Sequence, residues 1–410
     1  MTTPTITDPK LQSEYEALKA KGLKLDLTRG KPSAVQLSLS DELLRDASTE
    51  GEGGDYRNYG LLEGIPEARR LFADFLGTTP EKTFVLGSSS LTVMHDIVVQ
   101  MLLRPLPGEK ESLMAQIVAG KKPVFLCPVP GYDRHHAVCE KYGIGMIPIP
   151  LTEEGPDLAA IKRALAEHTV CGIWCVPKYS NPSGISYSRA VCEALASMQA
   201  GTGFRVVWDL AYQVHDLTDT PDELPDFLAL CDRAGNPDRA FVIGSTSKVT
   251  FASAGLALLA SSEKNLAWFK ESLVLQNIGP DKLNQLRHVL FLQDMENVRA
   301  HMQKHRAIIA PKFEAVDRSL AEHFGMSNVV RWNKPRGGYF VSLFVKPGTA
   351  KRVVQIAESL GVKLTPAGAA YPYGKDPVDS HIRLAPTYPP LREVEDAMAV
   401  VVVAIKIAAE

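Results

Sequence analysis

Apolar and polar residues alternate along this chain with two different periods. Seven short apolar runs, rich in β-branched residues and bounded by turn residues, predict strands at 84–86, 124–126, 146–149, 172–176, 206–208, 241–243 and 256–259. Stretches with the helical period, such as 158–166 and 190–198, lie between most of these runs. Strands that alternate with helices predict an α/β fold, with a mainly parallel seven-stranded sheet flanked by helices on both faces.

The pattern changes in the last third of the chain. A long charged helical stretch is predicted at 284–306, followed by strands at 338–345 and around Arg383. A chain of 410 residues exceeds the size at which a single core keeps growing. We therefore predict a large domain at 46–290 and a smaller α+β domain that combines 1–45 with 291–410.

Composition narrows the class of protein. A hydrophobic fraction of 45% is sufficient for a packed interior, and a net charge of −2 gives no reason to expect nucleic-acid or membrane binding. No stretch approaches the length of a membrane-spanning helix, and the first ten residues lack the apolar centre of a signal peptide. These features predict a cytoplasmic protein.

The six cysteines fall largely within apolar runs, which favours buried free thiols over a metal site. Cys171 and Cys175 are four positions apart on a predicted strand, so we expect their side chains on the same face. No second pair of ligands accompanies them, and we predict that no metal is bound.

An amine and a carboxylate each follow a predicted strand. Lys248 follows the apolar run 241–244 and three hydroxyl residues, and such a pocket can lower the pKa of an amine enough for Schiff-base chemistry. Asp209 ends the run 204–209, where a carboxylate could hold the nitrogen of a bound pyridine ring protonated. Tyr212 follows three residues later, within reach of the same ligand.

Two further motifs complete a set. Gly87 and the serines Ser88, Ser89 and Ser90 precede a predicted helix, so that their amides and hydroxyls are suited to a phosphate. Asn181 lies in a Pro- and Gly-containing turn after a strand, with its amide free to donate. Taken alone, each motif has an ordinary structural explanation: a surface lysine, a turn, a helix cap or a loop. Their combination indicates pyridoxal phosphate.

In this order, the motifs resemble those of the fold-type I pyridoxal phosphate enzymes, and specifically the class I aminotransferases related to aspartate aminotransferase. The resemblance extends from about residue 25 to the C-terminus. It implies that Lys248 carries the cofactor, that Asp209, Tyr212 and Asn181 contact its ring, and that Ser245 joins the serine-rich cup at the phosphate. It also implies that Tyr132 stacks on the ring.

The resemblance also implies a substrate site and a dimer. Arg383 matches the arginine that binds the substrate α-carboxylate, and Gly30 and Asn181 match residues beside the substrate. Tyr59 is similar to the tyrosine that reaches the phosphate of the neighbouring subunit, which implies a homodimer with shared active sites. The family's phosphate-binding arginine shortly after the lysine is absent here, as in a divergent bacterial branch, and Ser253 is a candidate to take over part of its contact.

The implied reaction is transfer of an amino group from an L-amino acid, with aspartate first, to 2-oxoglutarate by a ping-pong mechanism. A dicarboxylate needs a second cation, for which the candidates are Arg29, Lys31, Arg57 and Arg287. One alternative is a β-eliminating C–S lyase, which would use the same lysine and aspartate. Another is a non-catalytic pyridoxal phosphate-binding regulator, but too few residues precede Leu25 for the DNA-binding domain expected of one.

Overall fold

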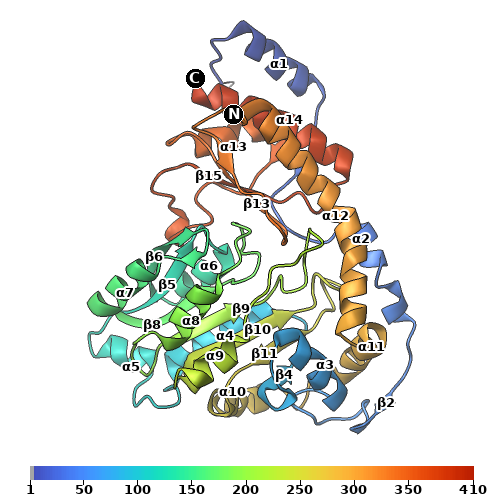
Figure 1. Cartoon of the computed structure of the whole chain (residues 1–410), viewed down its shortest axis with the longest axis vertical. Coiled ribbons are helices and arrows are strands. Elements are labelled where there is room, and N and C mark those ends of the chain that lie inside the picture. Colours follow the sequence, from blue (N-terminus) through green and yellow to red (C-terminus); the bar gives the residue numbers. More distant parts are fainter. Residues whose placement is uncertain (1–3) are drawn as a thin grey trace.

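The computed structural model describes residues 4–410 and contains one large central sheet (Figure 1). The strand order is β4 (Thr83–Val85), β11 (Ala257–Ala260), β10 (Ala240–Ser245), β9 (Arg205–Asp209), β8 (Thr169–Cys175), β5 (Pro123–Val129), β6 (Gly145–Thr152), β7 (Gly155–Pro156). The five strands from β10 to β6 in this order are parallel, whereas β4, β11 and β7 pair antiparallel with their neighbours. The mainly parallel sheet is confirmed.

All seven predicted strands are present, but the predicted number of strands was wrong because the sheet has eight. The additional strand, β7, contains only two residues and pairs with the end of β6 across a tight turn. Gly155, the first residue of β7 after this turn, has a φ of +130°. A two-residue strand is too short to show the alternation by which strands are recognised in a sequence.

Helices cover both faces of the sheet, and alternate residues of each strand enter two different apolar cores. In β9, Val206 and Trp208 face one core and Val207 faces the other. The first core includes α3 (Pro66–Leu76), α7 (Leu158–Glu167), α8 (Arg189–Ser197) and α9 (Phe227–Arg233). The second includes α4 (Ser90–Leu103), α5 (Leu113–Val118), α6 (Asp133–Lys141) and α10 (Glu263–Gln276).

All six cysteines are buried and free, as predicted. The expectation that Cys171 and Cys175 share a face was wrong, because Cys171 packs in the second core and Cys175 in the first. The register between β5 and β8 shifts at this point, pairing Val124 with Val170 and Phe125 with Gly172. The residue left between them is Cys171. A bulge of this kind reverses the alternation of side chains along a strand.

A second, smaller assembly is formed by the two ends of the chain (Figure 1). Its three-stranded antiparallel sheet contains β12 (Arg331–Trp332), β13 (Val341–Phe344) and β15 (His381–Leu384), which confirms the strands predicted there. Around it lie α1 (Pro9–Ala20), α13 (Ala350–Ser359), α14 (Leu391–Ala409) and the parallel pair β1 (Leu25–Asp26) and β14 (Val362–Lys363). One apolar cluster joins residues 11–27 with residues 313–408.

The predicted charged helix is two helices, α11 (Lys282–Leu292) and α12 (Met295–Phe324). Gln293 breaks it with a φ of +59°, and Asp294 caps α12 by accepting a hydrogen bond from Asn297 N. Early turns of α12 pack on the large core through Val298, and later turns pack on the small cluster through Leu320. The division into residues 46–290 and residues 1–45 with 291–410 stays a prediction, with which the separate clusters are consistent.

The remaining elements are short and lie before or between those named above. They are α2 (Ala34–Ser38), the hairpin of β2 (Glu50–Gly51) and β3 (Gly54–Asp55), and four single 3₁₀ turns at Asp41–Leu44, Pro80–Lys82, Pro237–Arg239 and Pro372–Gly374. Within residues 4–410 no helix has the length and apolar character needed to span a bilayer. The same residues contain no group of three metal-ligating side chains.

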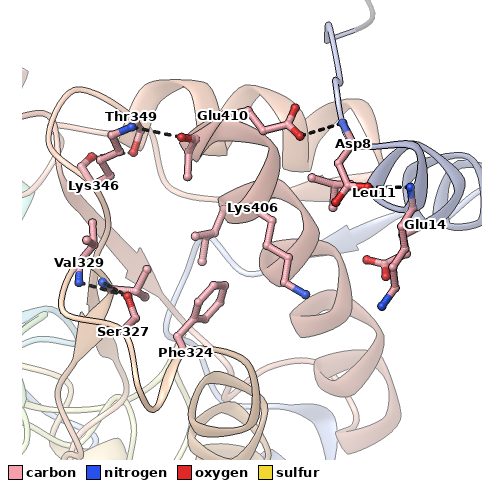
Figure 2. Close-up of a pocket in the computed structure, with 14 residues that line it drawn as sticks. Asp8, Leu11, Glu14, Phe324, Ser327, Val329, Lys346, Thr349, Lys406 and Glu410 are labelled. Atoms are coloured by element: carbon pink, nitrogen blue, oxygen red, sulfur yellow. Dashed lines mark hydrogen bonds between the residues drawn. The ribbon is translucent and has the colours of Figure 1, made fainter.

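A cavity of about 680 Å³ lies between α1, the end of α14 and the residues that follow α12 (Figure 2). Its lining combines apolar side chains such as Leu11 and Phe324 with charged ones such as Lys406 and Glu410. None of the residues to which the sequence assigns chemistry lines it.

Replacing Gly172 with alanine tests the packing at the centre of the sheet. A Cβ atom there would lie 2.5 Å from Cε1 of Phe125 and 3.1 Å from the carbonyl oxygen of Arg205. We expect Gly172→Ala to lower the free energy of unfolding by about 1–3 kcal/mol, measured by equilibrium urea denaturation. Gly201→Ala is the matched control, because no heavy atom lies within 4 Å of its Cβ position. Equal stability of the two variants would contradict this account of the packing.

Candidate functional site

The predicted site residues converge at the carboxyl-terminal edge of the parallel strands. Tyr132 follows β5, Asn181 follows β8, Asp209 ends β9, and Ser245 ends β10 three residues before Lys248. Because the strands run in the same direction, the segments that follow them meet at one edge of the sheet, where ligands bind in open α/β folds. The sheet therefore gathers residues that are more than 100 positions apart in the sequence.

Asp209 is 2% exposed and lies against a histidine that sequence reasoning missed. Its Oδ2 is 3.3 Å from Nε2 of His135, without hydrogen-bond alignment, and its Oδ1 accepts a hydrogen bond from Ala211 N at 3.0 Å. The His135 ring stacks on Trp174 at 4.3 Å between centroids and meets the edge of Tyr132 at 5.0 Å. These contacts fix the position of the carboxylate, and its orientation is set mainly by the backbone amide.

Lys248 is half-buried, and its Nζ lies 4.9 Å from the centroid of the Tyr212 ring. Desolvation lowers the pKa of this amine, and the carboxylate of Asp209 opposes that shift. Burial also raises the pKa of the Tyr212 hydroxyl well above its usual value, with further contributions from Tyr132 and Asp209. Tyr212 is therefore a neutral hydrogen-bond donor beside an amine that loses its proton more readily than usual.

Three buried histidines hold the backbone turn that carries Lys248. Nε2 of His215 is 3.4 Å from the carbonyl oxygen of Lys248, and Nε2 of His301 is 2.8 Å from that of Val249. Nε2 of His288 is 2.9 Å from the hydroxyl oxygen of Thr250.

Burial lowers the pKa of each of these three histidines, which favours the neutral form. Burial lowers the pKa of His288 to about 4, and burial together with the Lys248 charge places the pKa of His215 well below its usual value. They therefore position the turn without adding a positive charge beside the Lys248 amine. Sequence reasoning did not identify any of them.

The serine-rich segment presents hydrogen-bond donors of the kind that suit an anion. Ser89 is the N-cap residue of α4, but its side chain makes no capping hydrogen bond, so within residues 4–410 the first amides of this helix have no side-chain cap. Ser245 Oγ donates to Ser247 Oγ at 3.0 Å, and Ser247 Oγ donates to the carbonyl oxygen of Ser88 at 3.4 Å. The cup at 88–90 and the predicted phosphate-binding Ser245 are thereby connected.

The arginine that is missing after Lys248 has no evident substitute. Ser253 is exposed, and its side chain forms no hydrogen bond within residues 4–410. Across that range, no lysine or arginine side chain donates to residues 87–90 or 245–247. The donors around the cup are amides and hydroxyls.

Arg383 reaches the same edge from β15 in the smaller assembly. Its side chain is 9% exposed, and its Nη1 donates to Oδ1 of Asn181 at 3.4 Å and to Oδ1 of Asp133 at 3.2 Å. Its Nε donates to Thr365 Oγ1 and its Nη2 to the carbonyl oxygen of Thr28, both at 3.4 Å. The bond to Asn181 places these two predicted residues side by side and leaves Nδ2 of Asn181 available to donate.

Gly30 allows a close approach to its backbone, but the group that approaches is a side chain of this protein and not a substrate. A Cβ atom at Gly30 would lie 2.5 Å from Cζ of Phe340. The ring of Phe340 in turn lies 5.0 Å from the guanidinium carbon of Arg383. The structure therefore gives Gly30 a packing role beside the arginine.

Tyr59 is the exception among the predicted residues. Its side chain is 79% exposed and its hydroxyl forms no hydrogen bond within residues 4–410. The buried Lys282 braces the loop around it, because its Nζ donates to the carbonyl oxygens of Asn58 and, at 3.1 Å, of Gly60. An aromatic side chain is thus presented outward on a supported loop.

Comparison with known proteins identifies the family. The sequence profile described as aspartate amino-transferase matches residues 2–410. A protein of Mycolicibacterium smegmatis is 48% identical over 400 residues, covering 94% of this chain and 91% of the relative. An aspartate aminotransferase of Corynebacterium glutamicum is 42% identical over 405 residues, covering 97% and 93%.

The fold gives the same result. The crystal structure of an aspartate transaminase from Corynebacterium glutamicum superimposes with a TM-score of 0.94 at 41% identity, covering 98% of this chain and 95% of that one. Since the profile, the relatives and the structure agree over nearly the whole chain, this protein is an aminotransferase of the aspartate aminotransferase family.

Proposed function

We propose that this protein transfers the amino group of L-aspartate to 2-oxoglutarate with pyridoxal phosphate as its cofactor. One observation carries the proposal. A desolvated amine, a buried carboxylate and a guanidinium lie together at the edge where the segments following the parallel strands meet. The named aspartate aminotransferase among the relatives supports the choice of substrate.

The residues present fit the cofactor. Lys248 would hold its aldehyde, Asp209 would pair with its ring nitrogen, and Tyr132 would stack on the ring beside His135. The uncapped amides of α4, with Ser88, Ser89, Ser90 and Ser245, would receive the phosphate. When bound, the cofactor withdraws electrons from the substrate α-carbon.

The protein then supplies binding and proton transfer. Arg383 would bind the α-carboxylate through its planar fork of N–H groups, and Asn181 and Tyr212 would donate to the ring oxygen. The Lys248 amine would take the proton from the substrate α-carbon. It would then deliver this proton to the cofactor carbon that bears the transferred amino group. Its lowered pKa favours this role, because a general base must be deprotonated near the working pH. Release of a 2-oxo acid before the second substrate binds makes the kinetics ping-pong.

The side-chain carboxylate of aspartate needs a second cation, and the contacts favour Arg29. Thr28, its neighbour in the chain, accepts from Arg383 through its carbonyl oxygen, so Arg29 starts beside the α-carboxylate site. Arg57 is paired with Asp55, and Arg287 donates to the carbonyl oxygen of Asp46. Lys31 lies over the ring of Tyr388, 3.8 Å from its centroid.

We also propose a cytoplasmic homodimer with shared active sites. The exposed Tyr59 on its braced loop supports this assembly, because its hydroxyl is free to reach the phosphate of a second copy. Leu275 and Ile278 are exposed apolar side chains that a subunit interface could bury.

Removing the amine tests the reaction class. Lys248→Ala is expected to lower kcat/KM for aspartate by about a thousandfold, the scale on which general acid–base groups contribute. Borohydride reduction of the wild-type holoenzyme, followed by peptide mass spectrometry, should place the cofactor on the peptide that contains Lys248. Lys264→Ala is the control, because Lys264 is exposed and its one ion pair within residues 4–410 is with Asp238 at 3.9 Å. Full turnover by Lys248→Ala, or ammonia release from cystathionine at a higher rate than transamination, would contradict the proposal.

Replacing Arg29 tests the choice of dicarboxylate cation. Arg29→Ala is expected to lower kcat/KM for aspartate by roughly tenfold to a hundredfold, the effect of one hydrogen bond to a charged group, and to leave alanine turnover unchanged. The same ratio of aspartate to alanine turnover is measured for variants of Lys31, Arg57 and Arg287. If this ratio changes in one of those variants and not in Arg29→Ala, the residue replaced in that variant is the dicarboxylate cation and Arg29 is not.

Subunit complementation tests the shared site. Tyr59→Ala and Lys248→Ala proteins, each weakly active alone, are unfolded together and refolded as a mixture. A mixed dimer would contain one site with both Tyr59 and Lys248, so we expect activity well above the sum of the separate proteins. Sedimentation velocity checks that the mixture is dimeric, and additive activity in such dimers would rule out sharing through Tyr59.

A further inference from the structure

Arg383 already has a carboxylate partner within the protein. Asp133 is the first residue of α6, directly after Tyr132, and its Oδ1 lies 3.2 Å from Nη1 of Arg383. The side chain of Asp133 is 36% exposed, whereas that of Arg383 is 9% exposed. The pair connects the large sheet, through α6, with β15 of the smaller assembly.

Asp133 differs from the other partners of Arg383 in its charge. The amide oxygen of Asn181, the hydroxyl of Thr365 and the carbonyl oxygen of Thr28 are all neutral acceptors. Within residues 4–410, Asp133 provides the only carboxylate bonded to this guanidinium. A buried charge without a counter-charge is strongly unfavourable, so Asp133 stabilises Arg383 in its present position.

We propose that Asp133 is an internal counter-ion that the substrate α-carboxylate displaces. The inference rests on the proposed function, because it takes Arg383 as the group that binds this carboxylate. An incoming carboxylate at Nη1 would approach Oδ1 of Asp133, and two like charges at one donor repel each other. Binding therefore exchanges one carboxylate for another.

The position of Asp133 allows this exchange. It lies in the first turn of α6, where a partly exposed side chain can turn toward water without disturbing the helix. The positive end of the helix dipole continues to favour its negative charge after it has moved. Arg383 remains fixed meanwhile by Asn181, Thr365 and Thr28.

The consequence is a control on substrate affinity. Each carboxylate ligand must compete with Asp133, so the protein binds carboxylates less tightly than an otherwise identical site without that charge. The amino acid and the 2-oxo acid both carry an α-carboxylate, so both are affected. Removing the charge of Asp133 should lower the KM for both substrates and leave kcat unchanged, because the competition acts on ground-state binding.

The experiment is calorimetric titration of the holoenzyme with succinate, a dicarboxylate without an amino group to transfer. Asp133→Asn is expected to bind succinate about threefold to tenfold more tightly than the wild type, the scale for a partly exposed charge pair. Glu140→Gln is the matched control, because it removes one negative charge from an exposed position of the same helix. Arg383→Lys should bind succinate much more weakly, because a lysine cannot form the planar fork.

The outcomes separate the two hypotheses. Tighter binding by Asp133→Asn alone supports the counter-ion. Unchanged or weaker binding by Asp133→Asn, together with weak binding by Arg383→Lys, overturns the counter-ion and leaves the role of Arg383 intact. Equal tightening by Glu140→Gln also overturns it, because the effect would then be one of overall charge. If Arg383→Lys binds succinate as tightly as the wild type, Arg383 does not bind the carboxylate. The counter-ion proposal, which depends on that role, is then wrong as well.

Folding of the variants is checked separately. The melting temperature of each variant is measured with and without succinate. Asp133→Asn should melt at a lower temperature than the wild type without ligand and show a larger shift on adding succinate, because it has lost the internal pair but binds the ligand more tightly. Asp133→Ala provides a second replacement, and a smaller shift in both variants would count against the proposal.

Discussion

The desolvation of opposite charges at one edge of the sheet determines how the rest of the site is built. The Lys248 amine and the Asp209 carboxylate are both withdrawn from water, and burial acts on the amine by lowering its pKa while the carboxylate opposes that shift. Two further titratable groups beside Lys248 stay neutral. Burial lowers the pKa of His215, which leaves its imidazole neutral, and raises the pKa of Tyr212, which keeps its hydroxyl protonated. Charge in this part of the site is therefore confined to the Lys248 amine and the Asp209 carboxylate.

Such a site is supported by strands whose central residues are apolar. The parallel strands bury both faces against helices, so polar side chains are left for the strand ends and the turns that follow them. The smaller assembly brings Arg383 to the same edge from a different sheet. Because α12 packs on both apolar clusters and Arg383 bonds to Asn181 and Asp133, the two assemblies are in contact at the site, and the distance between Arg383 and Asp209 depends on both.

The sequence predicted those features that depend on residues close together in the chain. Strand periodicity located all seven longer strands of the large sheet, and a polar residue at or after the end of a strand singled out Lys248, Asp209 and Asn181, which the fold places at one edge of the sheet. What was missed depends on contacts between distant segments. His301 lies 52 positions from the carbonyl group it approaches at Val249, and Arg383 lies 250 positions from Asp133. No pattern within a helix reveals such a partner. The bulge at Cys171 was missed for the same reason, because it is a property of two paired strands.

The absence of an arginine after Lys248 is compatible with a phosphate site because charge is not the only means of binding a dianion. The start of α4 offers amides that no side chain caps, at the positive end of its dipole, and the hydroxyl of Ser247 joins the two serine-containing segments. Several neutral donors that converge in this way can replace one cation, as they do in phosphate sites at helix N-termini. In the proposed function Arg383 binds the carboxylate, so the two anionic ends of the proposed ligands would be distinguished by the kind of donor they meet.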